Sequence, residues 1–120
     1  MNYTQFISLI QTVVNGLSFS NPSGTGNTII INNNGSTITY QRGSSNFSID
    51  IQELWDVYTH FSGQSISCID LKNYKPHIYD SNQGGHSCHC TTLFLIFQYI
   101  GIITSINGSG VRNNPFWIQL

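Results

Sequence analysis

Residues 48–76 read SIDIQELWDVYTHFSGQSISCIDLKNYKP, and this stretch contains two helix starts of the same kind. Asp50 can cap a helix that begins at Ile51, and Glu53 stands where the second member of a capping box belongs. Apolar residues then recur at helical spacing until Gly63, which is a typical helix stop. We therefore expect a first helix from Ile51 to just before Gly63.

The same pattern of helix-start residues recurs a few residues later. Ser67 and Asp70 repeat the capping-box spacing, with Ile66 and Leu71 at the positions of a hydrophobic staple. Pro76 cannot continue a helix, so this second helix is short. After a loop over residues 76–85, a third helix is expected from about Ser87 to Ile100, with a buried apolar stripe.

The C-terminal part of the chain has the pattern of a hairpin. Residues 102–106 and 115–120 are rich in β-formers, and they flank the polar, glycine-containing segment 107–114. We expect two paired strands with an extended tip, and we expect Trp117 on the last strand to cover the third helix.

The order helix, short helix, helix, hairpin resembles the winged helix-turn-helix domain. The resemblance covers about residues 50–120 and is carried by this order, by the start of the second helix at residues 66–71 and by the glycine-rich wing. The link of about ten residues between the second and third helices is longer than the usual turn of this motif. The resemblance implies an α+β fold in which three helices are closed by a C-terminal β-hairpin wing.

An N-terminal helix and hairpin precede this unit. Residues 2–16 have one apolar helical face, residues 18–27 read as a flexible loop, and residues 28–33 and 36–41 flank Asn34-Gly35. Asn-Gly is typical of a two-residue turn with positive φ at both positions. We expect a single domain over residues 1–120, with 1–47 as a possible dimerisation arm and 48–120 as the winged-helix unit.

The resemblance implies a small DNA-binding protein, a regulator or component of a DNA transaction, acting on double-stranded DNA as a homodimer. Its third helix would be the recognition helix, and its wing and second helix would contact the phosphate backbone. The residues expected to bind DNA are Lys72, Lys75, Ser87, His89, Thr91, Thr92, Gln98, Arg112 and Asn113.

The charge of the chain favours an alternative. Charged residues make up 8% of the sequence and the formal net charge is -1, whereas an average domain has roughly 25% charged residues. Such a chain has no strong positive field with which to attract nucleic acid. A winged-helix module for protein–protein assembly without DNA binding is the second hypothesis, and Leu95, expected on the exposed side of the third helix, supports it.

The cysteines suggest a third hypothesis. Three cysteines without disulfide-framework spacing indicate a reducing, cytoplasmic setting. A metal- or thiol-dependent sensor or enzyme would use Cys88 and Cys90, with Cys68 and His86 as further metal ligands, but this spacing is poor for zinc. Cys90 is expected on the buried side. We expect no catalytic residues and no cofactor, no signal peptide, and no membrane span, because the longest apolar run is too short.

Overall fold

The computed structural model describes residues 1–80 and 87–120, and the chain is a mixture of helices and antiparallel sheets. The α+β class expected from the sequence is therefore confirmed. The chain forms two compact units, which we call the N-terminal unit (residues 1–60) and the C-terminal unit (residues 61–120). Each unit is described by itself.

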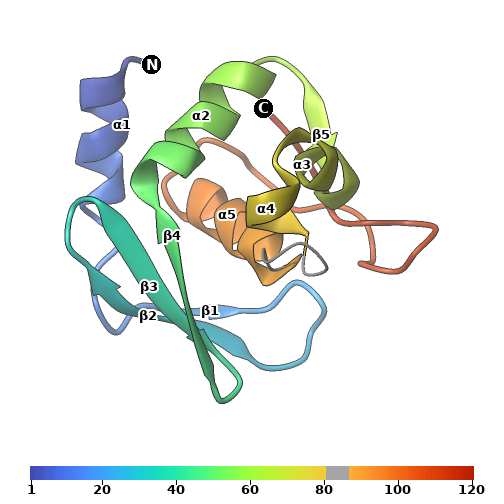
Figure 1. Ribbon diagram of the computed structural model, residues 1–120, viewed down its shortest axis with the longest axis horizontal. Coiled ribbons are helices and arrows are strands. Elements are labelled where there is room, and N and C mark those ends of the chain that lie inside the picture. The colour runs from blue at the N-terminus through green and yellow to red at the C-terminus, as the bar shows by residue number, and fades with distance from the viewer. Residues whose placement is uncertain (81–86) are drawn as a thin grey trace. The chain divides into compact units, whose positions relative to one another are not determined.

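The N-terminal unit contains a four-stranded antiparallel sheet in the order β1-β2-β3-β4 (Figure 1). The strands span Ser18–Ser20, Asn27–Asn33, Thr37–Arg42 and Ser45–Asp50. The two strands expected around Asn34-Gly35 are confirmed, and a further strand, β4, ends directly before Ile51. Strand β1 was not expected from the sequence. It pairs with β2, although it lies at the start of residues 18–27, whose composition predicts a loop.

The turn between β2 and β3 differs from the expected type. Gly35 has a φ of 88°, but no residue other than glycine has a positive φ in the part of the chain that the structure describes. Asn34 instead accepts hydrogen bonds through its side-chain oxygen from the backbone N–H groups of Ser36 and Thr37, at 2.9 and 2.8 Å. The prediction of positive φ at both positions was wrong, because the asparagine side chain organises a longer turn.

Two helices of the N-terminal unit meet through aromatic rings. Helix α1 (Tyr3–Ile10) begins with a capping box between Asn2 and Gln5, and α2 (Ile51–Phe61) begins where the sequence predicts. The ring centroids of Phe6 and Trp55 are 5.2 Å apart. The buried apolar residues of this unit come from α1, the turn after it, the sheet and α2: Phe6, Ile10, Val13, Ile30, Ile38, Tyr40, Ile49, Ile51, Leu54 and Val57.

The C-terminal unit is mainly helical. It contains β5 (Ser65–Ser67), α3 (Cys68–Tyr74), α4 (Pro76–Tyr79), α5 (Ser87–Tyr99) and β6 (Trp117–Gln119). The capping box of α3 is confirmed, because the N–H of Asp70 donates to Ser67 Oγ at 3.2 Å and the N–H of Ser67 donates to Asp70 Oδ2 at 2.8 Å. Helix α4 occupies the start of the segment that we expected to be a loop, since proline is well suited to the first turn of a helix.

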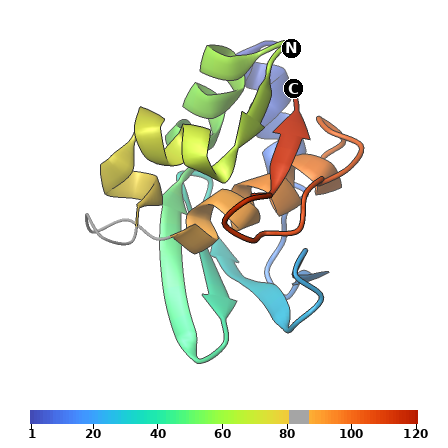
Figure 2. The same cartoon turned by 90° about the vertical axis from the view of Figure 1, so that its right-hand side faces the viewer.

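The expected C-terminal hairpin is not formed as predicted. Strand β6 pairs with β5, which places Ile118 opposite Ile66, and both are buried (Figure 2). Residues 102–106 form no strand; the N–H of Ile102 instead donates to the carbonyl oxygen of Phe97 at the end of α5. An isolated β-bridge joins Asn107, the first residue of the expected tip, to Trp117.

The side chains of β6 also point to the opposite faces of the strand from those that we expected. Side chains alternate along a strand, so burial of Ile118 turns Trp117 outward. Ile118 is 0% exposed, whereas Trp117 is 39% exposed. The prediction that Trp117 covers the third helix was wrong, because its neighbour Ile118 takes the core position.

Candidate functional site

Helix α5, the expected recognition helix, is almost entirely buried. His89 is 7% exposed and Thr92 is 0% exposed, while Thr91 is half-buried and donates its hydroxyl to the carbonyl oxygen of Cys88 at 3.2 Å. Leu95, expected on the exposed side, is 5% exposed. Apolar residues surround the whole helix after Thr92, and a helix that is apolar all round is buried. Leu95 is therefore not available as a surface contact for protein assembly.

The ends of this helix differ from its middle. Gln98 is exposed near the C-terminal end and donates to the carbonyl oxygen of Thr104 at 3.3 Å. The side chain of Ser87 and the whole of His86 lie outside the described residues. Of the expected DNA contacts on α5, the part of the chain that the structure describes therefore leaves only Gln98 fully at the surface.

The buried hydroxyl of Thr92 is energetically unusual. Its Oγ1 has no hydrogen-bond partner among the residues that the structure describes. A buried hydroxyl without a partner costs about 1–3 kcal/mol, because it has given up its hydrogen bonds to water. Thr92 therefore has the environment of a core residue and no access to a ligand.

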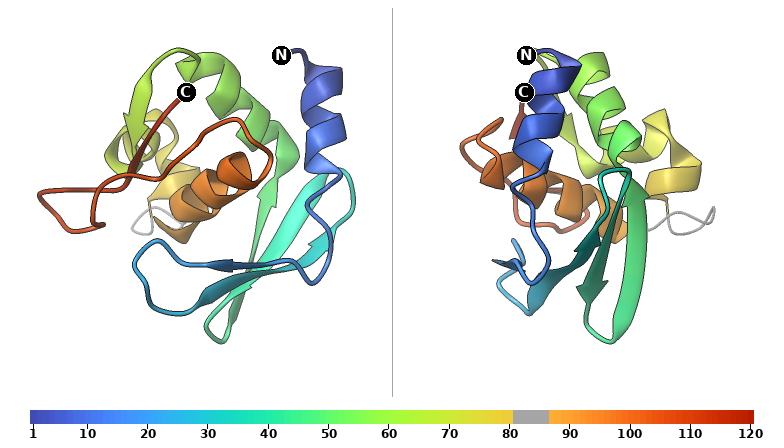
Figure 3. Two further views of the ribbon diagram at one scale, coloured as in Figure 1. Left: turned by 180° about the vertical axis from the view of Figure 1, so that it is seen from behind. Right: turned by 90° about the vertical axis from the view of Figure 1, so that its left-hand side faces the viewer.

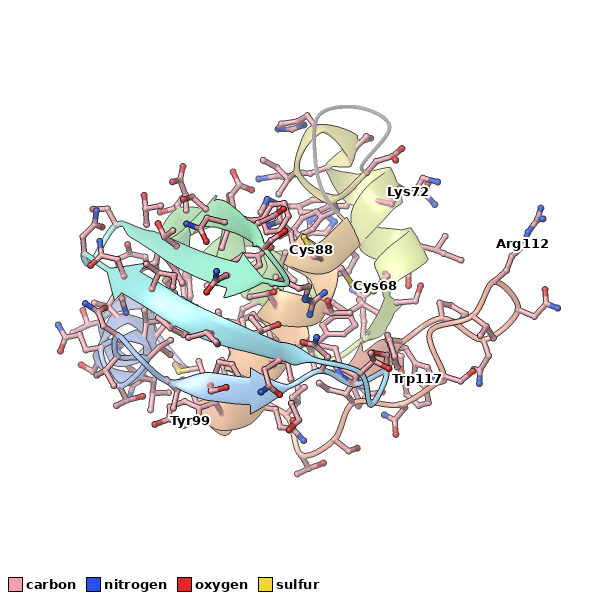
Figure 4. The ribbon with its side chains drawn as sticks, turned by 90° about the horizontal axis from the view of Figure 1, so that it is seen from below. Cys68, Lys72, Cys88, Tyr99, Arg112 and Trp117 are labelled. Atoms are coloured by element: carbon pink, nitrogen blue, oxygen red, sulfur yellow. A yellow bond between two sulfur atoms is a disulfide. The ribbon has the colours of Figure 1, made fainter. Side chains whose placement is uncertain are left out.

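Two cations lie on or directly after α3. Lys72 is exposed on this helix, and Lys75 follows its last residue. The Lys75 ammonium lies 5.3 Å from the centre of the Tyr74 ring, and that ring packs edge-on against Phe61. The aromatic contact holds Lys75 at the end of α3, whereas Lys72 points freely toward solvent (Figure 4).

The wing loop, which we define as residues 107–114, is a closed turn and not a loose connection. The N–H groups of Ser109 and Gly110 both donate to the carbonyl oxygen of Asn114, at 3.1 and 3.0 Å. The N–H of Asn114 in turn donates to the carbonyl oxygen of Val111 at 3.0 Å. The loop extends away from the helices of its own unit (Figure 3). Arg112, at its far end, is exposed.

Two glycines allow the wing loop to close. A Cβ atom on Gly108 would lie 2.2 Å from the carbonyl oxygen of Pro115, and one on Gly110 would lie 2.4 Å from the ring of Phe116. Both glycines also have positive φ, at 87° and 77°. The backbone of the loop therefore packs directly on residues 115–116, and this packing fixes the direction in which Arg112 and Asn113 are presented.

The positive charges are concentrated in the C-terminal unit. Three of the four cations are there, namely Lys72, Lys75 and Arg112, against two carboxylates. One of these carboxylates, Asp80, is 7% exposed, and the other, Asp70, belongs to the capping box of α3. The exposed surface of this unit consequently offers cations mainly from α3 and the wing loop.

The cysteines form a disulfide that the sequence did not reveal. Cys68, the first residue of α3, is bonded to Cys90 of α5, with an S–S distance of 2.09 Å and a Cα–Cα distance of 5.6 Å. Cys90 is buried as expected, but the expectation that all three cysteines are thiols was wrong. Local spacing could not reveal the pair, because 22 positions separate its members and the fold brings them together.

The disulfide removes two of the candidate ligands and thiols from the metal and thiol hypotheses. Two of the four candidate ligands, Cys68 and Cys90, have no thiolate to offer while they are bonded to each other. The remaining cysteine, Cys88, is half-buried and outside the disulfide. Within residues 1–80 and 87–120, no three His, Cys, Asp or Glu side chains are grouped so that they could hold a metal ion.

Comparisons with known proteins found no match for this chain. The chain matches no protein-family model, no curated protein and no solved structure. Among the helices that the structure describes, none is both long enough and apolar enough to cross a bilayer.

Proposed function

We propose that this chain is a DNA-binding protein of winged-helix type, a regulator or component of a DNA transaction. The observation that carries the proposal is the wing loop, a compact turn that presents Arg112 and Asn113 to solvent. The order of helices and the closing strand β6, which follows the wing loop, support the same assignment. The cations of α3 supply further contacts to an anionic partner.

The proposed contact is led by the wing loop and α3. Lys72, Lys75 and Arg112 bind phosphates, and the exposed amide of Asn113 can donate to or accept from a base edge or a phosphate. Helix α5 has a structural role, since His89 and Thr92 are buried. Three phosphate contacts per chain give modest affinity with a shallow salt dependence.

The test is binding to mixed-sequence duplex DNA as a function of salt concentration. Each phosphate contact contributes about −0.9 to the slope of log K against log salt, so K72A/K75A/R112A should bring the slope from roughly −3 toward zero and weaken binding. The charge-conserving variant K72R/K75R/R112K is the matched control and should keep the slope. Absence of binding at low salt, where electrostatic attraction is strongest, would contradict the proposal.

A second candidate function is assembly through the N-terminal unit, and exposed apolar side chains favour it. Met1, Tyr3, Val14 and Ile31 are 41–54% exposed. Burial of such side chains against a second copy would stabilise a homodimer. Sedimentation of the chain should then show a dimer that V14S/I31S dissociates, and a monomer at all accessible concentrations would contradict this candidate.

A further inference from the structure

Trp117 is an aromatic side chain placed outside the core of its own unit. It is 39% exposed, although its neighbours on both sides in the chain, Phe116 and Ile118, are buried. A large aromatic ring at the surface is a typical anchor for a binding partner. The residues around Trp117 indicate which kind of partner it suits.

The neighbours of Trp117 across the sheet are small and polar. Ser67 of β5 is paired with it on one side, and Asn107 is bridged to it on the other. Side chains of directly paired residues stand on the same face of a sheet. Serine and asparagine are both smaller than an indole ring, and 39% of Trp117 stays exposed beside them.

The rest of this face is also polar. Two residues away along the strands, Ser65 donates its hydroxyl to the side-chain oxygen of Gln119, and both residues are exposed. Arg112 projects from the wing loop that leads into Trp117, and Lys72 lies on the helix that follows β5 (Figure 4). An exposed aromatic ring with hydroxyl and amide neighbours, in a unit that has three cations and two carboxylates, suits a nucleobase better than an apolar protein surface.

We propose that Trp117 is a stacking surface for an unpaired nucleobase of bound DNA, whose phosphates are attracted by the net positive charge of the C-terminal unit. This inference rests on the proposed function and specifies its ligand: single-stranded DNA, or a duplex with a base displaced from its stack. The base stacks on the exposed part of the indole ring.

The experiment uses the fluorescence of Trp117 itself. The chain has two tryptophans, so W55F leaves Trp117 as the sole indole. Titration of W55F with oligothymidylate should quench this emission as thymine stacks on the ring. In the otherwise wild-type chain, W117L should weaken oligothymidylate binding by roughly 5- to 150-fold, the range for loss of one base–aromatic stack.

Two variants control for general effects. W117F retains a ring that can stack and should bind within a few-fold of wild type, which separates loss of stacking from loss of folding. Tyr99 is a matched exposed aromatic at the end of α5, 46% exposed and well away from Trp117 (Figure 4). Y99L should leave binding unchanged.

The outcomes separate this inference from the proposed function. Quenching, together with loss of binding in W117L and its retention in W117F and Y99L, supports the stacking surface. Duplex binding that depends on Lys72 and Arg112, with no effect of W117L on either ligand, overturns the stacking surface and leaves the proposed function standing. Absence of binding to both oligothymidylate and duplex overturns both.

Discussion

The buried hydroxyl of Thr92 leads to a prediction about stability. Valine has nearly the same shape but no hydroxyl, so T92V should raise the free energy of unfolding by about 1 kcal/mol in urea denaturation. T91V is the matched control and should give no such gain, because the hydroxyl of Thr91 already donates to Cys88. T92V should also leave DNA affinity unchanged. A clear loss of stability in T92V would show that this hydroxyl has a bonding role.

Gly110 leads to a second prediction at a single position. G110A places a methyl group against the ring of Phe116 in a backbone conformation that disfavours side chains. The free energy of unfolding should fall by about 2–4 kcal/mol, from positive φ and overpacking together. Gly16 has a similar φ but open space around it, so G16A should cost only about 1–2 kcal/mol. Equal losses in the two variants would mean that Phe116 yields without cost.

The disulfide between α3 and α5 stabilises the C-terminal unit by restricting the unfolded chain. For a closed loop of 22 residues, C68A/C90A should lower the free energy of unfolding by about 3 kcal/mol. Urea denaturation of the wild-type chain with a reductant should give a similar loss, whereas the double variant should not respond to reductant. C88A is the control and should retain the full response. A wild-type chain that is insensitive to reductant would show that the bond contributes nothing.

The elements themselves show where local information suffices. The starts of α2 and α3 were correctly placed. At α3 the reason is local, because the cap Ser67 and its partner Asp70 are three residues apart and act within one turn. The C-terminal hairpin was placed incorrectly, because a strand pairs with whichever edge buries its apolar side. Here β5 offers Ile66 to Ile118, whereas residues 102–106 follow the end of α5.

The distribution of charge across the chain sets what each unit can bind. The N-terminal unit has one arginine and three carboxylates, and the C-terminal unit has three cations and two carboxylates, so their formal charges are -2 and +1. A DNA partner, as proposed, would therefore be attracted more by the C-terminal unit than by the N-terminal unit. The low total charge limits this attraction, so the proposed DNA binding would depend on short-range contacts such as the proposed stacking on Trp117.

The sequence by itself determined the α+β class, the starts of α2, α3 and α5, and the β2–β3 hairpin, because caps, glycines and apolar periodicity act over a few residues. Lys72, Arg112 and Asn113, which the sequence proposes as DNA contacts, are exposed. Tertiary structure decided the burial of His89 and Thr92, the outward direction of Trp117 and the Cys68–Cys90 bond. These depend on which distant segments meet, and the free energy of that choice comes from burial of apolar surface over the whole unit.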